Sequence, residues 1–261
     1  MMERRSPVAV ARTFEVQRSN QRAYFDHAWL KTHHSFSFAE YHDPRYVNWG
    51  ALRVFNDDIV EAGKGFPTHP HRDMEIVTYV LEGRLEHLDS TGSRGVVGPG
   101  GVQFMSAGTG IRHSEYNNSK TEPLHFLQMW ILPGRLGVKP SYGQVEFALS
   151  DRRNKWLPVA SGRSAVDAPV ALTQDAGFFV TRLESDRELR YAFDPNRLGF
   201  LFAAEGAVKV EGIDEAGGAV GSDDLADGDA VRMSNLSSVS VRGQGEIVLW
   251  DVPRISDGAN D

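Results

Sequence analysis

The chain of 261 residues contains no cysteine, so disulfide bonds, thiolate metal sites and a cysteine nucleophile are all excluded. Any metal must therefore be held by histidine, aspartate, glutamate or neutral oxygen atoms. Basic residues are fewer than acidic ones, and the formal net charge is −7. The electrostatic field of a negatively charged protein argues against binding to the phosphate backbone of a nucleic acid, so we expect no direct nucleic-acid partner.

Long apolar segments are also missing. No run approaches the roughly 18 apolar residues that suggest a membrane span. The first residues, "MMERRSPVAVARTFEVQ", carry an arginine pair but no apolar core behind it. We therefore expect no signal peptide, no membrane partner and, by default, a cytoplasmic location.

Amphipathic helix patterns are scarce, and β-strand patterns take their place. Short runs of β-branched and aromatic residues alternate with turns, which the 26 glycines and 12 prolines punctuate. This pattern predicts an all-β sandwich or barrel. Two runs within 74–89, joined at Glu82-Gly83, predict a β-hairpin. The clearest strand runs lie within 50–63, 74–89, 124–134, 177–184, 198–212 and 246–253.

The two halves of the chain share one pattern. "TYVLEGRLEH" aligns with "LFAAEGAVKV", which places Gly83 over Gly206. The turns that follow, "PGGVQFM" and "DGDAVRM", place Gly100 over Gly228. Two copies of one β unit are the simplest explanation.

Two stretches of the first half could hold a metal ion. His69 and His71 are two apart, and so are His113 and Glu115. Residues two apart on a strand point to the same face, so two such strands would bring three nitrogens and one carboxylate oxygen to one ion. Either pair alone is more often a polar loop than a metal site. The glycines that frame both pairs allow tight turns and favour the metal site.

The remaining histidines lack paired spacing, and we expect structural or surface roles for them: His27, His33, His34, His42, His87 and His125. No histidine follows His125, and the positions that align with His69 and His71 in the second copy hold Ala192 and Asp194. The second copy is therefore expected to hold no comparable metal site.

The stretches "GKGFPTHPHRDMEIVTYVLEG" and "GGVQFMSAGTGIRHSEYN" resemble the two motifs of the cupin family. They depart from it in one extra residue before Gly83 and in Ser106, where proline is usual. Together with "HSFSFAEYHDP", "ALRVFNDD", "HLDSTG" and "LHFLQMWILP", they resemble the pirin family more closely, over residues 29–133. The resemblance implies a bicupin, which consists of two double-stranded β-helix barrels of jelly-roll type.

The same resemblance divides the chain. It implies an N-terminal metal-binding cupin domain over 8–140, a C-terminal degenerate cupin domain without a metal site over 141–253, and a tail over 254–261. The polar stretch within 136–168 suits a connector between two β units. The Gly- and Asp-rich stretch over 212–229 predicts an exposed acidic loop rather than a calcium site, because its acids lack regular spacing.

The resemblance also implies a site and an activity. The metal ligands would be His69, His71, His113 and Glu115, with Glu75 as an outer partner or a pocket carboxylate. Fe(II) is the metal expected first, although this ligand set also suits Mn, Ni, Co, Cu and Zn. The implied activity is that of a quercetin 2,3-dioxygenase, which opens a flavonol ring with dioxygen and releases carbon monoxide. The flavonol's enol oxygen would bind the metal, and Glu115 or Glu75 would take its proton.

A second class of function stays open. Pirins also act as metal-dependent, redox-sensitive interaction proteins and transcription cofactors, which would give this chain a protein partner and no dedicated substrate. Cupin folds host isomerases and hydrolases as well. We expect a monomer in either case.

Overall fold

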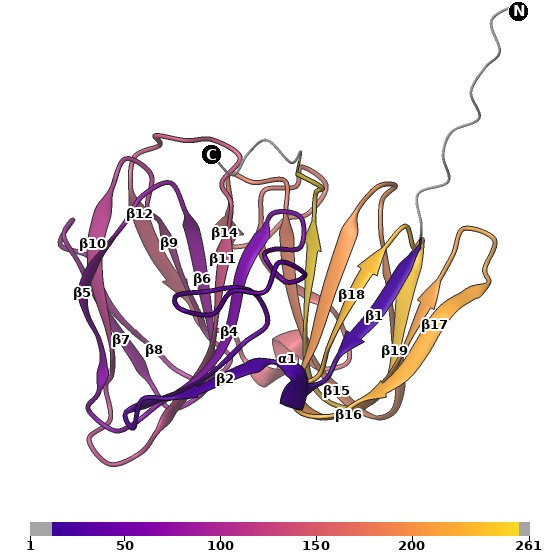
Figure 1. Ribbon diagram of the computed structural model, residues 1–261, viewed down its shortest axis with the longest axis horizontal. Helices are drawn as coiled ribbons and strands as arrows, with labels where there is room; N and C mark the ends of the chain where they lie inside the picture. The colour runs from indigo at the N-terminus through magenta and orange to yellow at the C-terminus, as the bar shows by residue number, and fades with distance from the viewer. Residues whose placement is uncertain (1–11, 256–261) are drawn as a thin grey trace, which may run out of the picture.

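The computed structural model describes residues 12–255, most of which lie in β-strands or in the turns between them. The strands form two barrel-like units side by side (Figure 1). Helix is limited to a 3-10 turn at Ser19–Gln21 and to α1 at Leu149–Arg152, and no described helix has the length and hydrophobicity to span a membrane. The all-β prediction is confirmed. The start of the chain, on which we based the absence of a signal peptide, and most of the predicted tail lie outside the described residues.

Two antiparallel sheets build the first unit. Its strands are β2 Ala23–Asp26, β3 Leu30–His34, β4 Leu52–Val60, β5 Gly65–His71, β6 Glu75–Glu82, β7 Leu85–Asp89, β8 Arg94–Val97, β9 Val102–Ser106, β10 Ile111–Asn117, β11 Leu124–Ile131 and β12 Ser141–Val145. Seven of them form the larger sheet, in the order β12-β9-β6-β11-β4-β3-β2, and four form the smaller one, in the order β5-β10-β7-β8.

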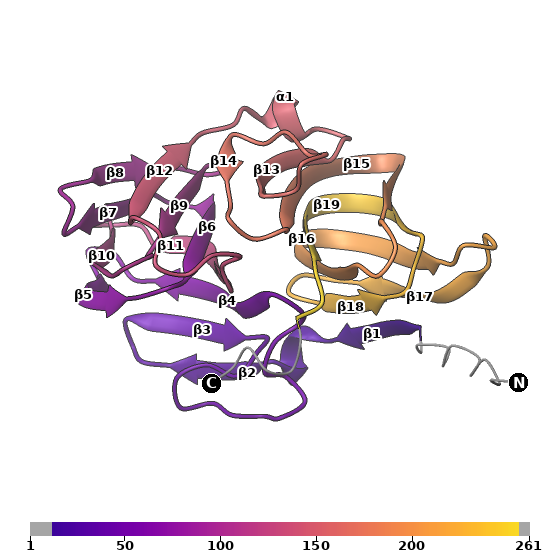
Figure 2. The same cartoon turned by 90° about the horizontal axis from the view of Figure 1, so that it is seen from above.

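One curled sheet of eight strands builds the second unit (Figure 2). Its strands are β1 Thr13–Gln17, β13 Leu157–Ser161, β14 Val170–Ala171, β15 Gly177–Ala192, β16 Leu198–Ile213, β17 Ala219–Leu225, β18 Ala230–Ser234 and β19 Ser238–Val252. The order is β1-β18-β16-β19-β15-β13-β14, and β17 pairs with β16. The long strands β15, β16 and β19 run through the whole unit.

The sheets divide the chain differently from the predicted boundary between residues 140 and 141. β1 comes first in the described chain, yet it pairs with β18 of the second unit. β12 begins at Ser141, yet it pairs with β9 of the first unit. Each unit therefore completes its sheet with a strand from the other side of that boundary.

Three local predictions need correction. The hairpin predicted at Glu82-Gly83 is wrong, because β6 lies in the larger sheet and β7 in the smaller one. Gly83, with a φ of 81°, turns the chain from one sheet to the other instead of back on itself. The acidic stretch contains β17, and the predicted connector contains β12, α1 and β13. Polar, turn-rich composition concealed these strands because they are partly exposed.

The internal repeat is visible in the backbone. In the first unit, Val80 exchanges two backbone hydrogen bonds with the turn at Gly100, and in the second, Ala203 exchanges two with the turn at Gly228. The two glycines have φ values of 77° and 80°. The same turn therefore recurs at the aligned positions, as the repeat predicts.

An apolar layer joins the two units, and its contacts show which face of the larger sheet packs against the second unit. The ring of Phe55 on β4 lies 4.8 Å from the rings of both Phe200 and Phe202 on β16. The indole Nε1 of Trp250 lies 3.0 Å from the sulfur of Met129 on β11. Because side chains alternate along a strand, the neighbours of Phe55 and Met129 in sequence point into the first barrel. That interior holds the candidate site.

Candidate metal centre

The three predicted histidine ligands converge. β5 and β10 are antiparallel neighbours, and the register places His69 opposite His113. Possible ligand atoms of His69, His71 and His113 all lie within 4.8 Å of one another. The Nε2 atoms of His69 and His113 are 3.0 Å apart. Two ligands at right angles, each about 2.1 Å from one ion, would be roughly 3.0 Å apart, so the spacing fits a shared metal.

The protonation of these histidines also suits a metal. His69 donates its Nδ1 proton to the Pro67 carbonyl at 2.8 Å, which leaves the Nε2 lone pair free. Burial, reinforced by the neighbouring His69, lowers the pKa of His71 to about 4. Burial and the neighbouring histidines lower the pKa of His113 to about 2. Both imidazoles are therefore neutral near pH 7, as metal ligands must be.

A buried hydrogen-bond chain fixes the orientation of His113. The Asp89 carboxylate accepts from Nε2 of His87 at 3.1 Å, so the Nδ1 of the neutral His87 ring is an acceptor. This Nδ1 lies 3.4 Å from Nδ1 of His113. His113 thus carries its proton on Nδ1 and offers Nε2 to a metal. The ring of Tyr142 stacks on His87 at 4.0 Å. His87, which we expected to be structural or on the surface, lies directly behind a predicted ligand.

Glu115, the predicted fourth ligand, lies beside this group. Its possible ligand atoms form a second group with His113 and His87, again within 4.8 Å. The side-chain amides of Gln128, at 2.7 Å, and Gln103 donate hydrogen bonds to its two carboxylate oxygens. Burial raises the pKa of Glu115 to about 7 even though these two hydrogen bonds oppose the shift. The structure thus places a buried carboxylate, held by two amides, next to His113 and His87, and the four predicted ligands do not form a single group within 4.8 Å.

Glu75 lies elsewhere. Its two carboxylate oxygens accept hydrogen bonds from the backbone N–H groups of Thr173, at 2.7 Å, and Gln174, at 3.2 Å. It belongs to neither group of possible metal ligands in the described part of the chain. Glu75 therefore links β6 to the second unit, and the structure does not bring it to the histidines.

A cavity of about 330 Å³ opens beside His69 and His71. His69, His71 and Glu115 line one side of it, and aromatic rings line another. The ring of Trp130 meets His71 edge-on at 4.8 Å and Phe38 edge-on at 5.2 Å. A planar ligand that reaches the histidines would therefore contact aromatic side chains.

The other histidines fall into three environments. His34 lines the cavity, although we expected no part for it in the site. His33 packs on Tyr24, and His125 lies 2.6 Å from an Asp57 oxygen. The side chains of His27 and His42 are exposed.

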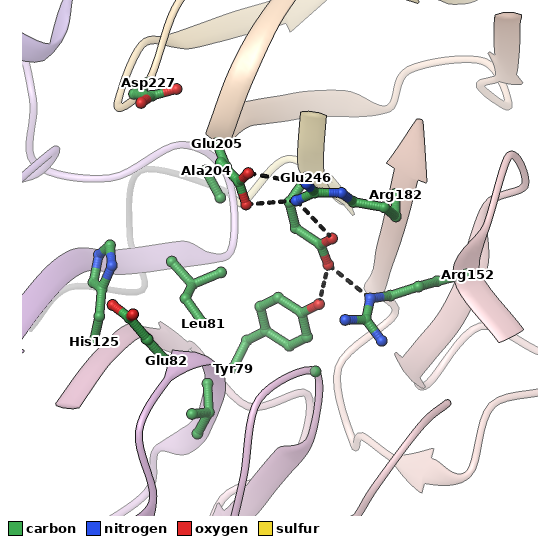
Figure 3. A pocket seen from close by; sticks show the side chains of 12 residues that line it. Tyr79, Leu81, Glu82, His125, Arg152, Arg182, Ala204, Glu205, Asp227 and Glu246 are labelled. Atoms are coloured by element: carbon green, nitrogen blue, oxygen red, sulfur yellow. Dashed lines mark hydrogen bonds and ion pairs between the residues drawn. The ribbon is translucent and has the colours of Figure 1, made fainter. Parts of the chain in front are cut away.

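A larger cavity, of about 490 Å³, lies between the two units (Figure 3). Glu246 at its wall accepts hydrogen bonds from the Tyr79 hydroxyl and from Arg152, the latter at 2.8 Å. Arg182 forms an ion pair with Glu205. These charged side chains satisfy one another across the joint between the units, so this cavity shows the chemistry of a structural joint rather than of a ligand site.

Comparisons with known proteins agree with this geometry. The family "Pirin" matches residues 14–131, and the "Quercetinase C-terminal cupin domain" matches residues 164–252. A quercetin 2,3-dioxygenase from Escherichia coli (strain K12) is 39% identical over 241 residues, which span 92% of this chain and 99% of that protein. A pirin-like protein from Caulobacter vibrioides is 40% identical over 226 residues, which span 87% and 94% of the two chains.

Solved structures give the same result. The crystal structure of the bacterial pirin YhhW from Escherichia coli in complex with nickel(II) has a TM-score of 0.83 and 38% identity, over 93% of this chain and 100% of that one. These matches confirm the predicted bicupin fold, and the nickel(II) complex supports one divalent metal in a site of this type. The chain belongs to the pirin family, and over nearly its whole length it resembles the quercetin 2,3-dioxygenase enzymes within it.

Proposed function

We propose that this protein is a metal-dependent dioxygenase that opens the ring of quercetin or a related flavonol. The observation that carries the proposal is the convergence of His69, His71 and His113, with the buried Glu115 beside His113, next to a cavity with aromatic sides. The likeness to quercetin 2,3-dioxygenase over 92% of this chain supports the choice of substrate.

We propose His69, His71, His113 and Glu115 as the residues that hold the metal, with Fe(II) as the metal tested first. The nickel(II) complex of YhhW makes nickel the first alternative, before Mn, Co, Cu or Zn. When bound, such an ion supplies a Lewis acid that acidifies an enol hydroxyl, together with open positions for small ligands.

The residues of this chain have separate tasks in the proposed reaction. Trp130 and Phe66 line the cavity and orient a planar ring system. Glu115 lines the same cavity and takes the enol proton, a role that its position beside His113 supports. Glu75, the other candidate, does not line this cavity and belongs to neither group of possible metal ligands in the described part of the chain. The Gln128 amide keeps the Glu115 carboxylate directed at the cavity.

Oxygen uptake and carbon monoxide release by the metal-loaded protein, measured with quercetin, test the proposal. His69→Ala and His113→Ala should lose bound metal and turnover together. Glu115→Gln should lower turnover by more than it lowers metal content. His42→Ala, at an exposed position, is the matched control and should behave as wild type. Ring opening by metal-free protein would overturn the mechanism. Absence of turnover with every flavonol, in metal-loaded protein, would favour the role as a metal-dependent interaction protein.

A further inference from the structure

A row of polar side chains crosses the inner face of the larger sheet. The strand register places side by side His34 on β3, Asn56 on β4, Gln128 on β11, Thr78 on β6 and Gln103 on β9. All five are buried. Small barrels normally fill such positions with apolar side chains, so the row calls for a functional explanation.

The second unit fills the same positions with different side chains. Leu201 and Val231 are the residues that align with Thr78 and Gln103 through the internal repeat, and they pair across β16 and β18 in the same way. The row continues there through Leu249. These residues belong to one buried apolar cluster. The fold therefore does not need a polar row, and the first unit has one for another reason.

At the β11–β6–β9 end of this row the glutamine N–H groups are paired, although Gln103 Oε1 has no partner among the described residues, and at the β3–β4 end several polar atoms are unpaired. Gln128 and Gln103 donate to Glu115. On the β3–β4 side, no described residue bonds His34 Nδ1, Asn56 Oδ1 or Asp58 Oδ1, although these residues are only 5%, 3% and 2% exposed. The indole Nε1 of Trp130 is likewise buried without a partner among the described residues. Buried polar atoms are nearly always paired in native proteins, so four such atoms in one place point to an absent partner.

All four side chains line the cavity that His69 and His71 also line. The larger cavity between the units differs in this respect, because the charged groups at its wall are bonded to one another. Several of the buried unpaired polar atoms among the described residues thus lie where a ligand of the metal site would lie, although others are found elsewhere.

We propose that His34, Asn56, Asp58 and Trp130 form a hydroxyl-binding subsite, which holds the end of the substrate that does not bind the metal. This inference rests on the proposed function, because it concerns the same cavity. The oxygens of Asn56 and Asp58 accept hydrogen bonds, and the indole of Trp130 donates one. A phenolic hydroxyl does both, so the subsite selects planar aromatic substrates with hydroxyl groups on the rings beyond the chelating group. The cavity, of about 330 Å³, is within the usual range for small-molecule sites.

Anaerobic binding to the metal-loaded protein tests the subsite without requiring turnover. The two probes are quercetin and 3-hydroxyflavone, which keeps the chelating hydroxy-keto pair and lacks the other hydroxyls. Wild type should bind quercetin more tightly. Asp58→Leu should weaken quercetin binding on the order of tenfold and leave 3-hydroxyflavone unchanged, since one net hydrogen bond is worth about that factor.

Two further variants provide a second test and a control. Trp130→Phe, which removes the indole donor and keeps an aromatic ring, should reduce the preference for quercetin in the same direction. It provides a second test if Asp58→Leu fails to fold. Asp57→Asn is the matched control, because Asp57 is the next residue on β4 and bonds Arg22 and His125 outside the cavity. It should keep the wild-type preference.

The outcomes separate the subsite from the oxygenase proposal. Three results would overturn the subsite. Asp58→Leu could weaken the binding of quercetin and 3-hydroxyflavone equally, or both Asp58→Leu and Trp130→Phe could keep the wild-type preference for quercetin. The third is that wild type binds neither ligand. If quercetin binds with the expected preference but takes up no oxygen when air is admitted, the subsite stands and the proposed reaction fails.

Discussion

Replacing His87 with phenylalanine should weaken metal binding, although the change leaves the three converging histidines intact. The ring would still stack on Tyr142, which lies 4.0 Å away in the wild type. The variant lacks the acceptor that faces Nδ1 of His113 at 3.4 Å. His113 would then be free to rotate or to change tautomer, so its Nε2 would no longer be directed at the metal.

The magnitude follows from the geometry of that contact. Removing a hydrogen-bond partner of a metal ligand typically costs 10- to 100-fold in metal affinity, or about 1.4–2.7 kcal/mol. Because the separation of 3.4 Å is long for a hydrogen bond, we expect a loss of about tenfold. Asp89→Asn keeps an oxygen that can accept from His87 Nε2, so its effect should be smaller.

Competition with a chelating dye of known affinity gives the metal dissociation constants of wild type and both variants. Denaturant unfolding of the metal-free proteins separates a local effect on His113 from general loss of the fold. An affinity of His87→Phe equal to that of wild type would refute the reasoning. So would a larger loss in Asp89→Asn than in His87→Phe.

Three further predictions concern stability, and urea denaturation of the metal-free protein measures each. Trp250→Ala should lower the free energy of unfolding by about 3–5 kcal/mol, because the ring is fully buried in the layer that joins the units; a loss below about 1 kcal/mol would contradict this packing. Tyr79→Phe should cost about 1 kcal/mol, since its hydroxyl bonds Glu246 across the joint, and an unchanged midpoint would count against that bond. Stability should fall as the pH drops from about 6.5 towards 4, because burial lowers the folded-state pKa of His34 to about 4 and the unfolded chain is protonated first. His34→Gln should remove about 2 kcal/mol of that loss of stability at pH 5. If the free energy of unfolding of this variant falls with pH as steeply as that of wild type, His34 is not the cause.

The convergence of His69, His71 and His113 was predictable because its signal is local. His69 and His71 lie on one strand with a spacing of two, and so do His113 and Glu115. Strand periodicity alone then places each pair on one face. The glycine-framed turns indicated that the two strands would meet, and the register of β5 and β10 is consistent with this.

Residues that no local pattern marks were missed. His87 reaches His113 only because β7 and β10 are neighbours in the smaller sheet. His34 and Asp58 meet at the cavity because β3, β4 and β11 pair in a particular register. A sequence without a known strand order does not contain this information in readable form, although isolated polar residues inside otherwise apolar strands were a signal that could have been followed.

Strand assignment failed for a related reason. The Glu-Gly step at Gly83 was a correct turn signal, but a turn does not say whether the chain pairs with itself or passes to another sheet. The choice depends on the backbone of residues 123–124, which lies so close to Gly83 that a Cβ there would meet the Pro123 oxygen at 2.6 Å. Such contacts between distant segments belong to the tertiary structure.

The most direct test of the central claim is a titration of metal-free protein with Fe(II), and with Ni(II) in parallel, in which bound metal and quercetin ring opening are measured on the same samples. We expect no carbon monoxide release without metal, and release that rises in proportion to bound metal until one ion per chain is reached. Ring opening in metal-free protein, or full metal occupancy without any turnover by either ion, would contradict it.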